Sequence, residues 1–272
     1  MKNFFKNLIF SKSNYKFFIN NYTKLDDLKT ISFASKSLRS TRSIKHIILD
    51  KPLKGNTLIF APHPDDEIIG LGGTMINSIK NKSSIHCIYF SSNKERSEES
   101  KKISKLLGFT TTNLKLKENN FIINKENLIK ISKIINEIKP QKIFLPFLFD
   151  DHDDHRRVNQ ILMEIEKNKL SKINYEVWGY QVYSFFPTNV YVDITKNINK
   201  KVFYLKKYKS QIKKKNFDHF TIGINAYNSR FINTKKISYG ETFFVCPKKD
   251  YLDLCQHYFK NPKKCFYNKN YI

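Results

Sequence analysis

The chain has 272 residues, of which 40% are hydrophobic and 14% aromatic, and its formal net charge is +25. This length fits one large α/β domain or two small ones, and the composition excludes an intrinsically disordered chain. Lysine supplies nearly all of the positive charge and is accompanied by abundant Asn, Ile, Phe and Tyr, a usage typical of AT-rich coding, so no nucleic-acid partner is predicted.

The sequence also carries signals about its compartment. No stretch approaches the roughly 20 consecutive apolar residues that span a bilayer. The basic, aromatic start lacks a small-residue cleavage site, so we do not interpret it as a signal peptide. The four cysteines are scattered and form no CxxC pair, which favours free thiols in a reducing cytoplasm. A peripheral contact between the basic start and an anionic membrane stays open at this stage.

Strand and helix patterns alternate after an N-terminal extension at residues 1–50. Apolar runs bounded by turn residues predict buried strands at 57–61, 84–90 and 142–147, and Leu114 with Leu116 marks a short strand. Apolar positions at helical spacing predict helices over 68–79, 95–107 and 125–138. This alternation predicts an α/β fold with a Rossmann-like, mostly parallel sheet and helices on both faces. We place the domain at residues 51–245 and expect a C-terminal tail at 246–272 to pack on it.

Polar clusters follow two of the predicted strands. The sequence P-H-P-D-D-E at 62–67 comes directly after the first strand, and D-D-H-D-D-H-R at 150–156 follows the strand at 142–147. In parallel sheets the active site lies beyond the carboxyl ends of the strands, so the two clusters are expected to converge there. Four carboxylates among seven residues would repel one another without a counter-ion, and a divalent metal is the natural one.

The spacing within these clusters suits a catalytic zinc site. His63 and Asp66 are three residues apart, so one turn places both on the same side, and one histidine of the second cluster completes three protein ligands beside an open position. Asp65 then points away from the metal, as a general base requires. His152 and His155 are also three apart, so one could bind the metal while the other stabilises an oxyanion.

These motifs resemble the signature of the PIG-L family, the LmbE-like deacetylases, which hydrolyse N-acetyl groups of N-acetylglucosaminyl substrates. The resemblance rests on P-H-P-D-D-E followed by Gly70, Gly72 and Gly73, and on H-D-D-H-R at 152–156. Weaker matches follow in order: R-S-E-E at 96–99, Y-V-D-I-T at 191–195, K-K-Y-K-S-Q at 206–211 and Y-G-E-T-F at 239–243. Together they extend from residue 57 to about 245 and cover most of the chain.

The resemblance implies that His63, Asp66 and His155 bind zinc, although iron or cobalt could occupy the same ligands. It implies that Asp65 is the general base, and zinc in such a site lowers the pKa of a water toward about 7.

The resemblance also assigns roles to two neighbours of these ligands. His152 would stabilise the oxyanion, and Asp154 would orient a histidine. The implied activity is removal of an N-acetyl group from an amino sugar, which could be free, nucleotide-linked or lipid-linked, in cell-envelope glycan or glycolipid synthesis.

One departure from the family concerns the substrate. Many members carry a glycine-rich loop with a substrate-binding arginine after the second strand, whereas residues 91–96 here contain no glycine, and Arg96 fits the helix match better. Two alternatives therefore stay open: a zinc amidase acting on a non-acetyl or non-sugar substrate, and a catalytically silent binding protein of the same fold. The sequence does not determine the oligomeric state.

Overall fold

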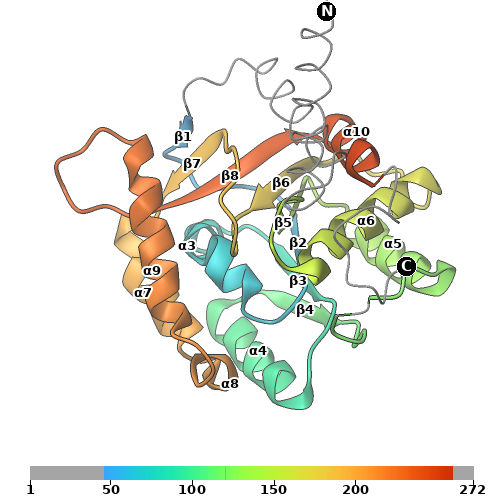
Figure 1. Cartoon of the computed structure of the whole chain (residues 1–272), viewed down its shortest axis with the longest axis horizontal. Coiled ribbons are helices and arrows are strands. Elements are labelled where there is room, and N and C mark those ends of the chain that lie inside the picture. Colours follow the sequence, from blue (N-terminus) through green and yellow to red (C-terminus); the bar gives the residue numbers. More distant parts are fainter. Residues whose placement is uncertain (1–45, 120, 260–272) are drawn as a thin grey trace, which may run out of the picture.

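Eight strands form one sheet in a computed structural model that describes residues 46–119 and 121–259 (Figure 1). The strands are β1 (Ile47–Leu49), β2 (Thr57–Ala61), β3 (Ile85–Tyr89), β4 (Thr110–Asn113), β5 (Lys142–Pro146), β6 (Glu176–Tyr180), β7 (Val190–Asp193) and β8 (Gly240–Pro247). The helices are α3 (Asp66–Lys80), α4 (Lys94–Leu107), α5 (Lys125–Ile138), α6 (Asp153–Lys167), α7 (Ile198–Leu205), α8 (Lys209–Ile212), α9 (Phe217–Asn228) and α10 (Lys248–Tyr258), with the 3₁₀ turns η1 (Thr195–Asn197) and η2 (Ser229–Phe231).

The strand order is β1-β7-β8-β6-β5-β2-β3-β4. The strands β2 to β6 pair in parallel, and β1 pairs in parallel with β7, whereas β8 is antiparallel to both of its neighbours. The chain moves outward from β2 to β3 and β4 and then returns to β5 on the other side of β2. The order therefore reverses between β2 and β5, and the carboxyl end of such a reversal is where doubly wound α/β sheets bind ligands.

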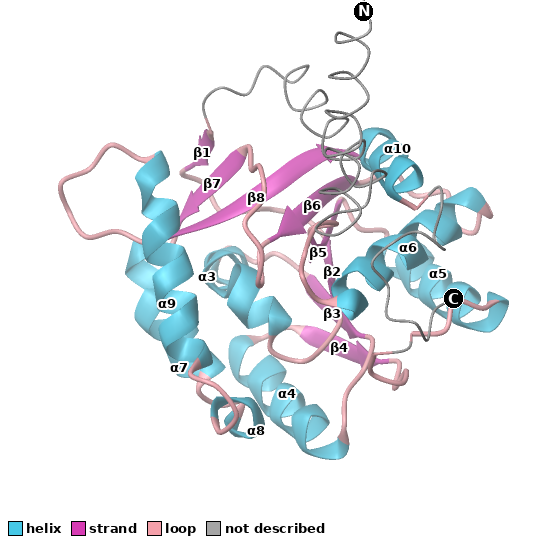
Figure 2. Ribbon diagram, viewed as in Figure 1, coloured by secondary structure: helices cyan, strands magenta, loops and turns pink. Residues whose placement is uncertain are grey.

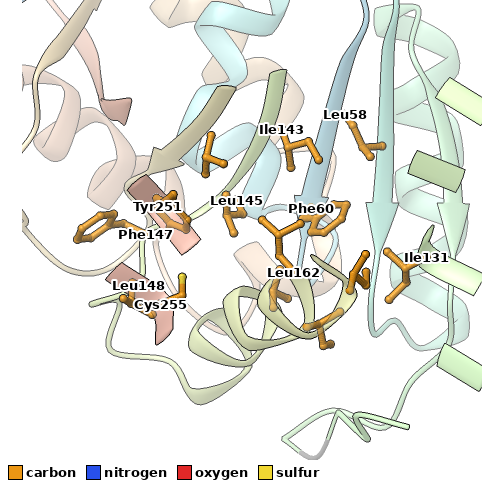
Figure 3. Close-up of a cluster of buried hydrophobic side chains, with 14 of the residues drawn as sticks. Leu58, Phe60, Ile131, Ile143, Leu145, Phe147, Leu148, Leu162, Tyr251 and Cys255 are labelled. Carbon is orange, nitrogen blue, oxygen red and sulfur yellow. The ribbon is translucent and has the colours of Figure 1, made fainter. Parts of the chain in front are cut away.

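Helices cover both faces of the sheet, as predicted (Figure 2). The face that carries Leu58 and Phe60 packs against α5, α6 and α10, and the face that carries Ile59 and Ala61 packs against α3, α4, α7 and α9. Successive residues of β2 thus alternate between two cores, as the pleat of a strand requires. Figure 3 shows the first core, where Leu162 of α6 and Tyr251 of α10 meet side chains of the sheet. The predicted α/β class is confirmed.

Most of the predicted elements are present, with small shifts at their ends. The strand at 57–61 and the helix at 125–138 have the predicted bounds. The short strand was placed wrongly: it lies at Thr110–Asn113, before Leu114 and Leu116. Those two leucines do pack against the core, but it is the β-branched threonine run that pairs with β3, because such residues suit a pleated edge.

The helix predicted at 68–79 begins earlier and contains a break. It runs from Asp66 to Lys80, and Leu71 has non-helical angles, with φ −144° and ψ 19°. Two glycines let it lie close to its neighbours. A Cβ on Gly70 would lie 2.2 Å from the Tyr180 ring, and one on Gly73 would lie 2.5 Å from Ile194. The glycines therefore serve close packing of α3.

Both ends of the predicted domain adjoin further elements. Residues 1–45 and 260–272 lie outside the described residues, so most of the predicted extension and part of the predicted tail fall there. Within the described part, β1 adds Ile47–Leu49 to the edge of the sheet beside β7. Helix α10 follows β8 directly and buries Tyr251, Leu254 and Cys255 in the first core. The division of the chain at 50 and 245 stays a prediction.

Candidate active site

Two loops at the carboxyl ends of the neighbouring strands β2 and β5 carry the predicted site residues. Strand β2 leads into His63 and Asp65, and Asp66 begins α3. Strand β5 leads into His152, the N-cap of α6, and His155 lies in the first turn of that helix. Because β2 and β5 pair in parallel, both loops leave the sheet at the same edge.

Three of these side chains meet at one point. The Oδ2 atom of Asp66 lies 3.4 Å from Nδ1 of His63 and 3.3 Å from Nε2 of His155. All three residues are buried, and their ligand atoms lie within 4.8 Å of one another. Atoms that share a tetrahedral zinc at about 2.0–2.1 Å are themselves about 3.3 Å apart, so the spacing fits a single small divalent ion.

Each of the two histidines also has a carboxylate on its other ring nitrogen. Nε2 of His63 lies 2.9 Å from Oδ2 of Asp154, and Nδ1 of His155 lies 2.9 Å from Oδ1 of Asp150. The second contact has the distance of an ion pair without the angles of a hydrogen bond. A carboxylate on the far nitrogen fixes the ring and its tautomer, as is usual for metal-binding histidines.

The electrostatics of the cluster suit a cation. Burial raises the pKa of Asp66, but His155 and His63 together outweigh it and hold that pKa well below its usual value. Burial lowers the pKa of His155, whereas Asp66 and Asp150 raise it to about 10. This balance favours a proton on His155, and a metal bound to its Nε2 would have to displace that proton.

A second group of possible ligands overlaps the first. His63, His152 and Asp154 also place ligand atoms within 4.8 Å of one another. In this group the 2.9 Å contact between His63 and Asp154 is a hydrogen bond, and His152 is only partly buried. The first group leaves that hydrogen bond intact, so it is the better candidate for the metal.

Asp65 lies beside the cluster with a different partner. Its Oδ1 atom accepts a 2.6 Å hydrogen bond from the Arg96 guanidinium, which also donates to the carbonyl of Pro64. Burial raises the pKa of Asp65 to about 7, although Arg96 opposes this. Its φ of 121° is rare for a residue other than glycine and stores strain at the site.

Glu67 stabilises the strained backbone at Asp65 through a hydrogen bond. This buried carboxylate accepts from the backbone N–H of Asp65 at 3.0 Å and from the hydroxyl of Tyr208 at 2.6 Å. Tyr208 lies directly before α8, in the K-K-Y-K-S-Q segment. The sequence match in that segment therefore includes a residue that contacts the first loop.

His152 lies beside His63 and His155 and outside the first group of possible ligands. Its ring centre lies 5.0 Å from that of His63 and 4.9 Å from that of His155. Its Nδ1 accepts the backbone N–H of Asp154, so the neutral ring carries its proton on Nε2. Burial lowers the pKa of His152, which keeps the ring neutral. The Tyr183 ring stacks on the His155 ring, with 5.4 Å between their centres.

The structure thus brings all six predicted residues into one region and adds several that the sequence did not assign. Asp150, Arg96, Glu67 and Tyr183 each contact a predicted residue, and Tyr208 contacts Glu67. Arg96 lies on α4, as the helix match required, yet its side chain reaches the first loop.

The sequence profile of the PIG-L family, described as GlcNAc-PI de-N-acetylase, matches residues 58–166. The segment that holds both site loops therefore matches the PIG-L family model. The resemblance stated from the motifs is confirmed over that segment, which contains all six of the predicted site residues and Arg96.

Solved structures share the fold of this chain. The N,N'-diacetylchitobiose deacetylase of Pyrococcus horikoshii has a TM-score of 0.63 and 22% identity, over 80% of this chain and 92% of that one. The conserved protein TT1542 of Thermus thermophilus has a TM-score of 0.61 and 21% identity, over 70% and 93%. The 4-carboxy-2-hydroxymuconate hydratase GalB of Pseudomonas putida has a TM-score of 0.60 and 14% identity, over 71% of this chain and 96% of that one. Since a hydratase shares the fold, the fold alone does not choose the reaction.

Proposed function

We propose that the chain is a zinc-dependent N-deacetylase that acts on an N-acetylated amino sugar or its glycoconjugate and releases acetate and a free amine. The observation that carries this proposal is the grouping of His63, Asp66 and His155, in which Oδ2 of Asp66 lies 3.4 and 3.3 Å from the nearest nitrogens of the two histidines. A spare carboxylate and a spare histidine lie beside them, within the segment that matches a family described as a de-N-acetylase.

Each residue has a task in amide hydrolysis. When bound, a divalent metal supplies Lewis acidity to water and to the amide carbonyl oxygen. Asp65 accepts a proton from the attacking water while the new C–O bond forms, and Arg96 fixes the direction of that carboxylate. His152 donates its Nε2 proton in a hydrogen bond to the oxyanion. The oxyanion then re-forms the C=O bond as the C–N bond breaks, and the amine leaves with the proton that Asp65 accepted.

Two carboxylates contact the ring nitrogens of the proposed histidine ligands that face away from the metal. Asp154 and Asp150 lie 2.9 Å from the far nitrogens of His63 and His155, so they keep the lone pairs of the near nitrogens directed at the metal. We keep the role of Asp154 as a positioning one, because it reaches His63 and not the point where the three ligands meet.

The proposed setting follows from the same family. We propose a cytoplasmic enzyme of cell-envelope glycan or glycolipid synthesis, with peripheral contact of the basic residues 1–50 to an anionic membrane. In the described part of the chain, every helix is too short or too polar to cross a bilayer. The proposed substrate classes are the free, nucleotide-linked and lipid-linked N-acetylhexosamines.

The test pairs metal content with acetate release on purified full-length protein. We expect about one zinc per chain, loss of metal in Asp66→Ala, and loss of acetate release with retained metal in Asp65→Asn. Asp151→Asn is the matched control, because Asp151 is exposed in the same acidic loop and should keep both properties. Metal without acetate from any N-acetylhexosamine would favour an amidase of another substrate. A folded chain without metal would contradict the proposal and favour a binding protein.

A further inference from the structure

The helix that begins with the proposed ligand Asp66 is broken after its first turn. Leu71 has φ −144° and ψ 19°, so α3 consists of a short segment at 66–70 and a longer one from Gly72 onward. A break of this kind leaves the last carbonyls of the first segment and the first N–H groups of the second without partners in the helix. Buried groups of that kind need other partners.

A buried lysine and a buried glutamate occupy the break. Nζ of Lys201 donates to the carbonyl of Ile69 at 2.7 Å. The carboxylate of Glu241 accepts from the N–H of Gly73 at 2.8 Å and from the N–H and hydroxyl of Thr74 at 2.7 and 2.6 Å. The two charges also pair with each other at 2.6 Å. The cation thus binds the end of the first segment and the anion binds the start of the second.

Each ammonium proton of Lys201 has a hydrogen-bond partner. Lys201 uses its third proton on Oδ1 of Asn225 at 2.9 Å, and Asn225 in turn donates to the carbonyl of Gly240. Lys201 is fully buried and Glu241 is 1% exposed. A charge pair at this depth is stable only when its remaining hydrogen-bonding capacity is used, and here every ammonium proton is. The orientation also follows the helix dipole, which favours a cation at a C-terminus and an anion at an N-terminus.

The elements that supply the pair are distant from the metal loops in sequence. Lys201 lies on α7 and Glu241 on the antiparallel strand β8. Neither side chain touches His63, Asp66 or His155 in any hydrogen bond or ion pair of the described residues. Their hydrogen-bonded link to the proposed metal site is the five-residue turn at 66–70, because Lys201 donates to the carbonyl of Ile69 in that turn.

We infer that Lys201 and Glu241 are positioning residues that hold the turn at 66–70, and with it the carboxylate of Asp66, in the geometry that binds the metal. This inference rests on the proposed function, since it assigns a role toward that metal. A pair that served stability alone could be replaced by apolar side chains with little loss. If apolar side chains replaced Lys201 and Glu241, the carbonyl of Ile69 and the N–H groups of Gly73 and Thr74 would lose their hydrogen-bond partners. The turn that carries Asp66 would then no longer be fixed by Lys201.

Metal affinity and site geometry test this inference separately from stability. The variants are Glu241→Gln, which keeps the shape, Lys201→Met, and the exchanged pair Lys201→Glu with Glu241→Lys. Leu254→Ala on α10 is the control, because Leu254 is buried in the other core. For each protein we would measure zinc affinity by competition with a chromophoric chelator, the visible spectrum of the Co²⁺ form, and the melting temperature without metal.

We expect Glu241→Gln and Lys201→Met to bind zinc about tenfold more weakly, as loss of outer support typically does, and to alter the Co²⁺ spectrum. Leu254→Ala should melt earlier and keep its affinity within about twofold. The exchanged pair should not restore affinity, because the lysine would then face N–H donors and the glutamate a carbonyl. Unchanged affinity and spectrum in both single variants would overturn the inference, as would rescue by the exchange. A wild type without metal would overturn the proposed function first, and the inference with it.

Discussion

Replacing Asp150 by asparagine should weaken metal binding without unfolding the chain. Its carboxylate lies 2.9 Å from Nδ1 of His155 and accepts the backbone N–H groups of His152 at 3.1 Å and Tyr183 at 3.0 Å. The amide side chain of the variant has a single acceptor oxygen, so it must give up either the histidine or a backbone contact. Loss of a carboxylate that supports a metal-binding histidine typically lowers metal affinity 10- to 100-fold, so we expect zinc affinity to fall by about that factor.

The assay is zinc competition against a chromophoric chelator, with the melting temperature of the metal-free protein as a check on folding. Asp151→Asn is the matched control, because the same change is made one residue away on an exposed side chain. It should leave affinity unchanged. An Asp150→Asn protein that binds zinc as tightly as the wild type would refute the reasoning, and so would an equal loss in both variants.

Three further predictions follow from other parts of the structure. Gly73→Ala places a Cβ 2.5 Å from Ile194 and should destabilise by about 1–3 kcal/mol, whereas Gly223→Ala meets nothing within 4 Å in α9 and should stabilise by about 0.5–1 kcal/mol; thermal melts that move the same way would contradict this. Arg96→Met should lower kcat about tenfold with metal content unchanged, because Asp65 loses its partner; unchanged kcat would remove Arg96 from the site. Chelation should lower the melting temperature reversibly, since metal at about 1,000 times its Kd stabilises the folded state by about 4 kcal/mol. A melting temperature that changes neither with chelator nor with added zinc would argue against a bound metal.

The local parts of the fold were predictable from the sequence. Strand β2 and helix α5 had the predicted bounds, because an unbroken apolar run and a helical stripe depend only on neighbouring residues. The same logic predicted that two polar clusters at strand ends would meet, and the parallel pairing of β2 with β5 brings them together. The strand predicted at Leu114 and Leu116 was wrong, because the burial of these two leucines comes from tertiary packing and not from strand pairing.

The long-range partners were not predictable. Arg96 reaches Asp65 across 31 residues, and Lys201 reaches Glu241 across 40. No periodicity encodes such a contact, since it depends on how α4 and α7 lie against α3. The break at Leu71 was hidden for the same reason, because a helical apolar pattern continues through it. The nearby glycines marked close packing but not the ion pair that fills the gap.

The most direct test of the account is a crystal structure of the zinc-loaded protein with anomalous scattering at the zinc edge. The account predicts one zinc bound by Nδ1 of His63, Oδ2 of Asp66 and Nε2 of His155 at about 2.0–2.2 Å. Asp65 should lie beside the open position and outside the ligand set. Zinc held instead by His63, His152 and Asp154, or no zinc at either group, would contradict the account.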